Sequence, residues 1–375
     1  MLLYKDIKKA LLKVYGSQQG NSFRRCRILL WMLCGAIKRG KSHLKDLGSE
    51  FPEDIVPIAI GMESRVKKVK RWLTNKYTDY EITFVPCIDS ILQGYIKDNK
   101  ELVFSIDGSE VGNGCTALMI SLCIGKRALP VCWVVRKCKK GHFPAEMHLD
   151  LFTILHKLLK NYDNVVVLGD GEFDNHVVMD ACRLWNWHFV FRTAKNTKIF
   201  DGWEEYPIGQ IAFYAGEYPQ QFMTVSDVYY TKQRYGPVNA TVWKEPKWDN
   251  PICLLSNFDP DSYRECYEFA RYYKKRWSIE TLFGDIKSRG FNIHKSKLTD
   301  PQRLKKLLII ICIAYILVFQ LGKNEQNSPF ISKVTRKDRM DLSIFSLGKK
   351  LIHFCIKNSI SIFFSIHEKA FIQLE

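Results

Sequence analysis

The chain has 375 residues, with 56 Lys and Arg against 39 Asp and Glu, which gives a formal net charge of +17. Because 46% of the residues are hydrophobic, the chain can bury substantial cores; its length predicts two or three domains and excludes a disordered chain or a single small scaffold. Positive charge on this scale favours a polyanionic partner, either nucleic acid or an acidic membrane surface.

Residues 1–95 are predicted to form a helical region. Turn signals separate amphipathic segments at 5–15, 24–38, 42–47 and 62–75. The last of these, MESRVKKVKRWLTN, places its valines and Leu73 on one helix face, and basic residues cover the rest. We predict a DNA-binding region of helix-turn-helix character, although the same basic face fits an ordinary solvated helix and no turn signature specifies the motif. The candidate DNA-binding residues of this helix are Arg65, Lys67, Lys68, Lys70 and Arg71.

Residues 96–195 change to a strand-rich pattern. The runs LVFSIDGS, CTALMISLCIG and ALPVCWVVRK predict an antiparallel meander. A helix at 145–160, a strand at 164–170, a helix at 175–185 that Asp174 could cap, and a strand at 187–193 are predicted to follow. Because a helix separates the third and fourth strands, the fourth can run parallel to the first. We therefore predict an α/β fold, a ribonuclease-H-like mixed sheet with flanking helices.

The rest of the chain is predicted in three parts. Residues 196–258 are aromatic, strand-like and punctuated by Gly and Pro, which indicates a β-rich insertion. Residues 259–325 are predicted to be the second part of the α/β core, beginning with one long helix at 260–290. Residues 326–375 are a C-terminal segment of mixed pattern.

The most apolar run, LLIIICIAYILVF at 307–319, tests the membrane alternative. A bilayer-spanning helix needs about 20 apolar residues, and this run is shorter and flanked by lysines, so we predict a buried helix and no membrane association. The N-terminus lacks the apolar core and cleavage site of a signal peptide, which favours the cytoplasm. Twelve cysteines without a CxxC pair argue against a zinc site.

Two aspartates follow predicted strands that can run in parallel. Asp107 is predicted to end the first strand and Asp170 the fourth, so both carboxylates emerge at the same edge of the sheet. Neighbouring strands lie about 4.8 Å apart, which brings the two groups within reach of a shared ion. Clustered carboxylates are the ligands that Mg²⁺ or Mn²⁺ prefers, although an Asp-Gly pair after a strand is more often only a turn.

A third motif lies in RYYKKRWSIETLFGDIKSRG. Here Tyr273, Arg276, Glu280 and Lys287 stand at offsets 0, 3, 7 and 14, which places all four on one stripe of a continuous helix. The alternative interpretation is an exposed i,i+4 ion pair between Arg276 and Glu280, with Tyr273 merely packed.

With these motifs the chain resembles the DDE transposases of the cut-and-paste bacterial insertion-sequence group whose hallmark is a Tyr-Arg-Glu-Lys helix. The resemblance covers most of the chain: the aspartates of FSIDGS and LGDGEFD, the β-rich insertion, the helix with the four residues, and the segments ESRVKKVKRWL, DPQRLKKL and SIFSLGKKL. The chain departs from the pattern at Gly171, where relatives often carry Arg after the second aspartate.

The resemblance implies roles for these residues. Asp107, Asp170 and Glu280 would be the catalytic triad and would bind two Mg²⁺ ions, for which Mn²⁺ can substitute. Water would first nick the DNA, and the freed 3′-hydroxyl would then attack another phosphodiester. Tyr273, Arg276 and Lys287 would contact DNA phosphates near the metals. The implied partners are double-stranded DNA with terminal inverted repeats, target DNA, and a second copy in a homodimeric synaptic complex associated with the nucleoid.

Two other functions remain open. One is a ribonuclease-H-like nuclease that cuts without joining, and the other is a transposase-derived DNA-binding protein that has lost catalysis. Among accessory residues, Glu172 and Asp174 lie close to Asp170 in the sequence. Relatives stack an aromatic side chain on a flipped base. The candidates here are Trp203, Trp243 and Trp248, although packing within the insertion is the better explanation for each.

Overall fold

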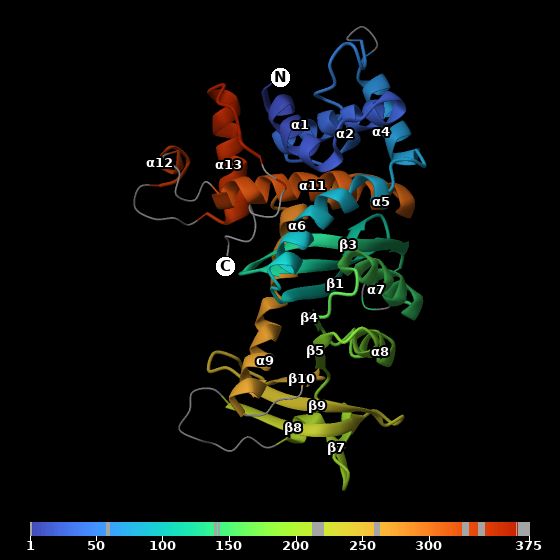
Figure 1. Ribbon diagram of the computed structural model, residues 1–375, viewed down its shortest axis with the longest axis vertical. Helices are drawn as coiled ribbons and strands as arrows, with labels where there is room; N and C mark the ends of the chain where they lie inside the picture. The colour runs from blue at the N-terminus through green and yellow to red at the C-terminus, as the bar shows by residue number, and fades with distance from the viewer. Residues whose placement is uncertain are drawn as a thin grey trace.

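The computed structural model describes residues 2–57, 61–138, 141, 143–211, 221–258, 263–324, 330–336, 342–364 and 366. Within these residues ten strands form one mixed sheet with helices packed around it (Figure 1). The strand order is β3-β2-β1-β4-β5-β10-β9-β8-β6-β7. The protein is therefore of the mixed α/β class, as predicted.

Six helices precede the first strand. Their bounds are α1 Leu2–Tyr15, α2 Gly20–Arg39, α3 Leu44–Leu47, α4 Gly61–Thr74, α5 Tyr80–Thr83 and α6 Val85–Lys97. The four predicted helices are confirmed, and α5 and α6 are additional. Helix α6 has Pro86 in its first turn, where no backbone donor is needed, and it buries Ile88, Ile91 and Leu92 at helical spacing.

The predicted strands and their directions are confirmed in the central half of the sheet. Strands β1 (Leu102–Gly112), β2 (Cys115–Ile124) and β3 (Arg127–Lys137) form an antiparallel meander. After α7 (Ala145–Leu159), β4 (Val165–Gly169) runs parallel to β1. After α8 (His176–Leu184), β5 (His188–Thr193) runs parallel to β4.

The predicted cap of α8 is wrong by one residue. The side chain of Asn175 accepts a hydrogen bond from the Val178 amide at 3.2 Å and caps the helix. The carboxylate of Asp174 instead accepts a hydrogen bond from the Thr193 hydroxyl at 2.5 Å. Both residue types cap helices well, so neighbouring positions cannot be separated by propensity alone.

The predicted β-rich insertion extends the same sheet. Strand β10 (Ile252–Ser256) pairs antiparallel with β5, and β9 (Tyr235–Lys244) and β8 (Gln221–Tyr230) follow it outward. The short strands β6 (Lys198–Phe200) and β7 (Glu205–Pro207), followed by the 3₁₀ turn η2 (Ile208–Gln210), complete this end of the sheet. The insertion is therefore continuous with the central strands through β10.

The single helix predicted at 260–290 is wrong: the described residues form α9 (Tyr263–Lys275) and α10 (Ser278–Ile286). Between them the amide of Glu280 bonds to the carbonyl of Trp277, three residues back, at 3.2 Å. This tighter turn changes the direction of the chain between α9 and α10. Ala270 and Tyr273 of α9 join a small apolar cluster with β4 and β10, whereas α10 joins the main core. One straight helix could not bury both apolar faces.

Helix α11 (Pro301–Asn324) lies between the N-terminal helices and the sheet, against α2, α13 and β3 (Figure 1). The prediction that its apolar run is buried in a helix is confirmed, but the length argument behind it is wrong, because the helix extends past the run at both ends. By length and composition α11 is the one helix of the described part that could span a bilayer, yet 89% of its most apolar window is buried inside the protein. That burial is typical of a core helix.

The C-terminal segment contains α12 (Ile331–Val334) and α13 (Ile344–Lys357). Helix α13 crosses α11 at a close approach of two glycines. A Cβ atom at Gly322 would lie 2.0 Å from the carbonyl oxygen of Ile344, and one at Gly348 would lie 2.0 Å from that of Val318. Only glycine fits at this crossing.

Candidate active site

The first two predicted acids lie just past the paired stretch of β1 and β4. The parallel pairing ends with Ser105 and Leu168, and the same offset, continued two residues further, aligns Asp107 with Asp170. The prediction that Asp107 ends the first strand is wrong: Asp107 lies inside β1, because β1 continues its antiparallel pairing with β2 as far as Gly112. Its carboxylate is 3% exposed and accepts a hydrogen bond from the Gly108 amide at 2.7 Å. Asp170 is half-buried.

The third predicted acid, Glu280, lies in the first turn of α10 and forms an ion pair with Arg276. The Arg276 Nη2 to Glu280 Oε1 distance is 2.6 Å, with the arginine side chain 7% exposed and the carboxylate side chain 50% exposed. Burial lowers the pKa of Arg276, but Tyr273, Glu280 and Asp107 raise it further, so the net pKa is raised. Two of the predicted acids, Glu280 and Asp107, therefore interact electrostatically with the buried guanidinium of Arg276.

Tyr273 is fully buried beside the same guanidinium. Its ring centroid lies 5.6 Å from the Arg276 Cζ atom. Its hydroxyl has no hydrogen-bond partner of ordinary geometry in the described part of the chain, and neither has Arg276 Nε. Burial raises the pKa of this hydroxyl, Arg276 and Arg192 lower it, and Asp170 raises it. The structure thus groups Asp107, Asp170, Glu280, Tyr273 and Arg276.

The four motif residues do not lie on one continuous helix, so that expectation is wrong. Tyr273 lies in α9, Arg276 in the turn after it and Glu280 in α10, and Lys287 is the C-cap of α10, where its amide bonds to the Phe283 carbonyl at 2.9 Å. The reason is the tight turn at Arg276 and Trp277, which changes the rotational phase between the two helices.

A cleft of about 810 Å³ opens beside Asp170. Arg192 of β5 lines it and is exposed, and no described residue forms an ion pair or hydrogen bond with its guanidinium. Our sequence analysis missed this residue. The available signal was one charged residue near the end of the apolar strand HFVFRT, beside the strand that carries Asp170. Glu172 and Asp174 line the same cleft, and the pKa of Asp174 is raised by burial despite the Thr193 hydrogen bond.

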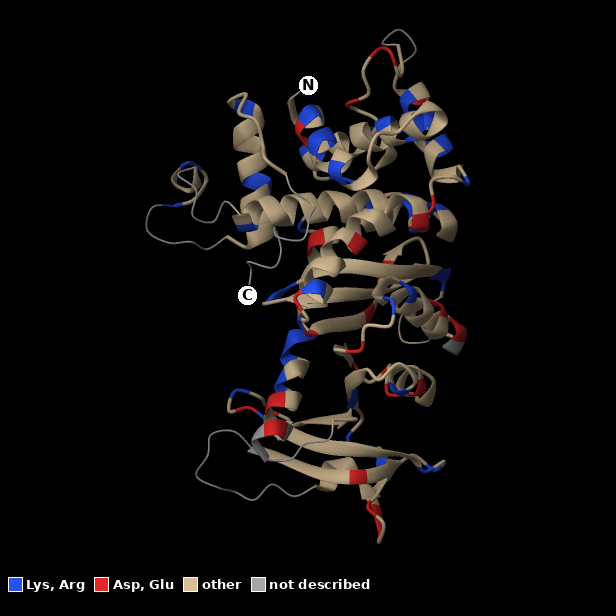
Figure 2. Cartoon of the chain, in the orientation of Figure 1, with Lys and Arg blue, Asp and Glu red and all other residues tan. Residues whose placement is uncertain are grey.

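The basic residues predicted on α4 divide into two sets. Arg65 Nη1 donates hydrogen bonds to the carbonyls of Gly48, Ser49 and Phe51 at 3.2, 3.2 and 2.7 Å, so this guanidinium holds the turn after α3. Lys67, Lys70 and Arg71 are exposed and Lys68 is half-buried. Figure 2 shows Lys and Arg gathered on α4 and the other N-terminal helices.

The three tryptophans of the insertion occupy different environments. Trp243 is fully buried and lies 4.9 Å from Trp248, centroid to centroid. Trp203, in the turn between β6 and β7, is 93% exposed. Packing therefore explains the first two but not Trp203.

Carboxylate oxygens suit a hard divalent cation, so the donor chemistry of Asp107, Asp170 and Glu280 fits Mg²⁺. Among the described residues, however, no three His, Cys, Asp or Glu side chains converge closely enough to hold one ion together. Glu280 is directed at Arg276 instead. Binding of an ion by all three acids requires Glu280 to exchange that partner.

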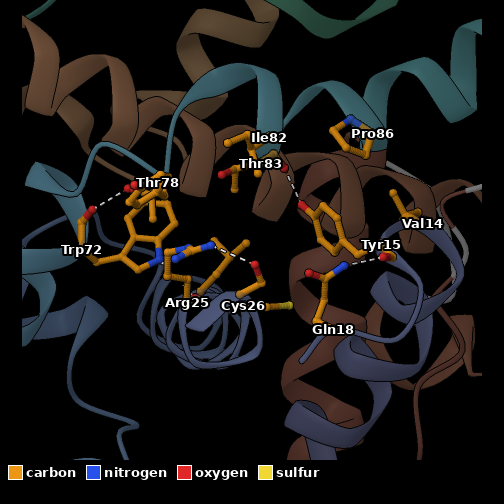
Figure 3. A pocket seen from close by; sticks show the side chains of 13 residues that line it. Val14, Tyr15, Gln18, Arg25, Cys26, Trp72, Thr78, Ile82, Thr83 and Pro86 are labelled. Atoms are coloured by element: carbon orange, nitrogen blue, oxygen red, sulfur yellow. Dashed lines mark hydrogen bonds between the residues drawn. The ribbon is translucent and has the colours of Figure 1, made fainter. Parts of the chain in front are cut away.

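A separate pocket of about 200 Å³ lies among the N-terminal helices (Figure 3). None of the predicted site residues lines it. Its polar lining groups bond within the protein: Trp72 Nε1 donates to the Arg25 carbonyl at 3.1 Å, and Gln18 Nε2 donates to the Tyr15 carbonyl at 2.6 Å. Its geometry is that of a packing gap between helices.

The sequence model of the transposase DDE domain family matches residues 106–317, which is more than half of the chain. The chain therefore belongs to the transposases with a DDE domain, and Asp107, Asp170 and Glu280 all fall within the matched region. No curated protein matches the chain significantly.

Two solved structures are similar to the chain at low identity. One is the piggyBac transposase in a cryo-EM structure of its synaptic complex with hairpin DNA, with 14% identity and a TM-score of 0.41 over 96% of this chain and 80% of that one. The other is the crystal structure of the NurA nuclease from Sulfolobus solfataricus, with 10% identity and a TM-score of 0.28 over 70% of this chain and 92% of that one. Both are too remote to assign residue roles.

Proposed function

We propose that the chain is a cut-and-paste DNA transposase of the Tyr-Arg-Glu-Lys group, with a ribonuclease-H-like core. One observation carries the proposal: inside the family-matched region, the offset of the β1–β4 pairing, continued two residues past its last pair, aligns Asp107 with Asp170, and Asp107 raises the pKa of Arg276 in the Arg276–Glu280 pair. The strand order β3-β2-β1-β4-β5, with β4 and β5 parallel to β1, supports this fold name. The N-terminal region 1–95 binds DNA, and residues 96–195 and 259–325 form the catalytic core around the insertion 196–258, with 326–375 as a C-terminal segment.

Asp107, Asp170 and Glu280 would hold two Mg²⁺ ions, for which Mn²⁺ can substitute. Bound in this way, the metal would supply activation of the attacking oxygen and stabilisation of the leaving oxygen. Burial of Asp107 keeps bulk water away from one side of the site. When Glu280 turns from its ion pair, Arg276 becomes free to bind a phosphate.

The cations and the tyrosine position DNA phosphates. Arg276 Nε and the Tyr273 hydroxyl are buried donors without partners in the described residues, and leaving them unsatisfied costs about 1–3 kcal/mol each. A phosphate oxygen between them removes that cost. Arg192 faces the cleft beside Asp170. It supplies the cation that relatives often place after the second aspartate, where this chain has Gly171. Lys287, the C-cap of α10, would be the fourth contact.

These roles predict a sequence of two reactions on double-stranded DNA. Water cleaves one strand at the element's inverted repeats, and the resulting 3′-hydroxyl attacks the next phosphodiester by in-line displacement. A homodimer would hold two ends together, in the cytoplasm and on the nucleoid. Net positive charge supports strong, salt-dependent binding to DNA.

The test is a Mg²⁺-dependent cleavage and strand-transfer assay on duplexes that carry the ends of the encoding element. We expect wild type to cleave and join, and Glu280→Gln to bind the same DNA without doing either. Glu268→Gln is the matched control, since Glu268 is an exposed acid of α9 paired only with Arg271 in the described structure, and it should retain activity. Cleavage without joining would indicate the nuclease. Binding without cleavage in Mg²⁺ or Mn²⁺ would indicate the silent relative.

A further inference from the structure

A cleft of about 300 Å³ lies between the N-terminal helices and the segment that leads into α11. One wall comes from α3 and α4, and the other from residues 296–303. Each wall contributes two cations, which are Lys45 and Lys70 on the first and Lys297 and Arg303 on the second. Positive charge from two distant parts of the sequence therefore converges on one concave surface.

These four cations lack counter-charges. No carboxylate in the described part of the chain forms an ion pair with any of them. The lining includes one acid, Asp300, whose Oδ1 accepts a hydrogen bond from the Arg303 amide at 2.7 Å and caps α11. Four cations against one carboxylate leave a net positive charge on the lining, and a cleft with an excess of one sign of charge concentrates ions of the other sign.

Hydrogen bonds join the two walls on either side of the cleft. The Ser42 hydroxyl donates to the Asn292 carbonyl at 3.2 Å, and the Lys306 ammonium donates to the Asn75 carbonyl. These contacts join residues more than 200 positions apart in the sequence. The cleft is therefore a fixed junction between the N-terminal helices and the segment around α11.

The same junction is fixed to the strand that carries Asp107. At the turn between β1 and β2, Asn113 Nδ2 donates to the Leu298 carbonyl at 2.9 Å, and Cys115 Sγ donates to the Thr299 carbonyl at 3.5 Å. From Asp107 to Asn113 the chain runs along β1, so at about 3.3 Å per residue the two ends are separated by about 20 Å.

We propose that this cleft binds backbone phosphates of the same DNA duplex that the active site cleaves. This proposal rests on the proposed function. Lys67 and Arg71 of α4 are exposed and continue the positive surface past the cleft, so the ligand is a polyanion longer than the cleft itself. At about 3.4 Å per base pair, 20 Å corresponds to about 6 base pairs. For a duplex whose axis runs along β1, the cleft would therefore hold the DNA backbone about half a helical turn from the bond that is cleaved.

The experiment measures binding of the full-length protein to a fluorescent element-end duplex over a series of salt concentrations. Each lost phosphate contact should reduce the slope of log K against log salt by about 0.9. We expect that reduction in Lys297→Gln and in Arg303→Gln. Lys295→Gln is the matched control, because Lys295 is exposed on the same segment but does not line the cleft, and its slope should equal that of wild type.

A second arm locates the contact on the DNA. Neutral methylphosphonates placed about 5 to 7 base pairs from the cleavage position should weaken binding by wild type, and they should weaken binding by Arg303→Gln less, because one cation of the cleft is already absent. Thermal unfolding checks that each variant is folded, and Lys70→Gln on the opposite wall replaces any that is not.

The outcomes separate this proposal from the one on which it rests. If wild type binds the duplex and Lys297→Gln, Arg303→Gln and Lys70→Gln all behave as Lys295→Gln does, the cleft proposal is wrong and the transposase proposal stands. If wild type itself shows no salt-dependent binding to the duplex, the proposed function fails first.

Discussion

Replacement of Tyr273 by Phe tests whether the candidate site is built for a ligand. The Tyr273 hydroxyl is buried without a hydrogen-bond partner in the described residues. An unsatisfied buried hydroxyl costs about 1–3 kcal/mol, and part of that is offset by the nearby Arg276 cation. We therefore expect Tyr273→Phe to increase the free energy of unfolding by about 1 kcal/mol, because the cost is removed and the ring still packs.

The same substitution should impair catalysis. If the hydroxyl donates to a DNA phosphate, its loss removes a hydrogen bond to a charged group, worth about 1.5–3 kcal/mol. That corresponds to a decrease of about 10- to 100-fold in the rate of end cleavage. Stability and activity should thus change in opposite directions.

The neighbouring tyrosine provides the matched control. The Tyr272 hydroxyl donates to Glu101 Oε2 at 2.9 Å, so Tyr272→Phe breaks a bond that exists. It should lower the free energy of unfolding by about 1 kcal/mol and leave cleavage unchanged. Urea unfolding of the three proteins gives the stabilities, and a cleavage time course gives the rates. If Tyr273→Phe is destabilised as much as Tyr272→Phe and cleaves DNA at the wild-type rate, Tyr273 is only a packing residue and our reasoning is wrong.

Three further predictions concern stability. Gly348→Ala should lower the urea midpoint, because overpacking against the Val318 carbonyl costs about 1–3 kcal/mol and exceeds the helix-propensity gain of about 1 kcal/mol. Gly284→Ala is the control and should not lower the midpoint, because the added methyl group meets only the flexible end of Arg289. Burial lowers the pKa of His148 below 6.5, so the unfolded chain binds this proton more readily than the folded protein does. The free energy of unfolding should therefore fall as the pH drops through 6.5 towards the folded-state pKa. His148→Leu should weaken that dependence in unfolding curves measured at pH 7.5 and 5. Arg65→Gln should cost about 1–2 kcal/mol of stability by releasing three carbonyls, and a salt series should show an unchanged DNA-binding slope.

The sequence alone predicts the elements that local periodicity and local turns specify. The strand runs around Asp107 and Asp170 and the helix between them imply the parallel pairing, because a crossover helix permits it. Boundaries were less certain. Asn175 and Asp174 are equivalent as helix caps in sequence, and only the contact of Asp174 with Thr193 in β5 distinguishes them.

What only the tertiary structure decided is how distant segments share space. The helical period of 260–290 is continuous in sequence, but burial in two different clusters breaks it at Arg276 and places Lys287 beyond the helix. In the sequence Arg65 cannot be told apart from the other basic residues of α4. Only its hydrogen bonds to the carbonyls after α3 show that it has a structural role. Arg192 lies beside Asp170 only because β5 is the neighbour of β4 in the sheet. Lys70 and Lys297 line one cleft only because contacts such as that of Ser42 with Asn292 join segments more than 200 residues apart. Local patterns record which face of an element is apolar, whereas the partner of each charged side chain is set by packing between elements.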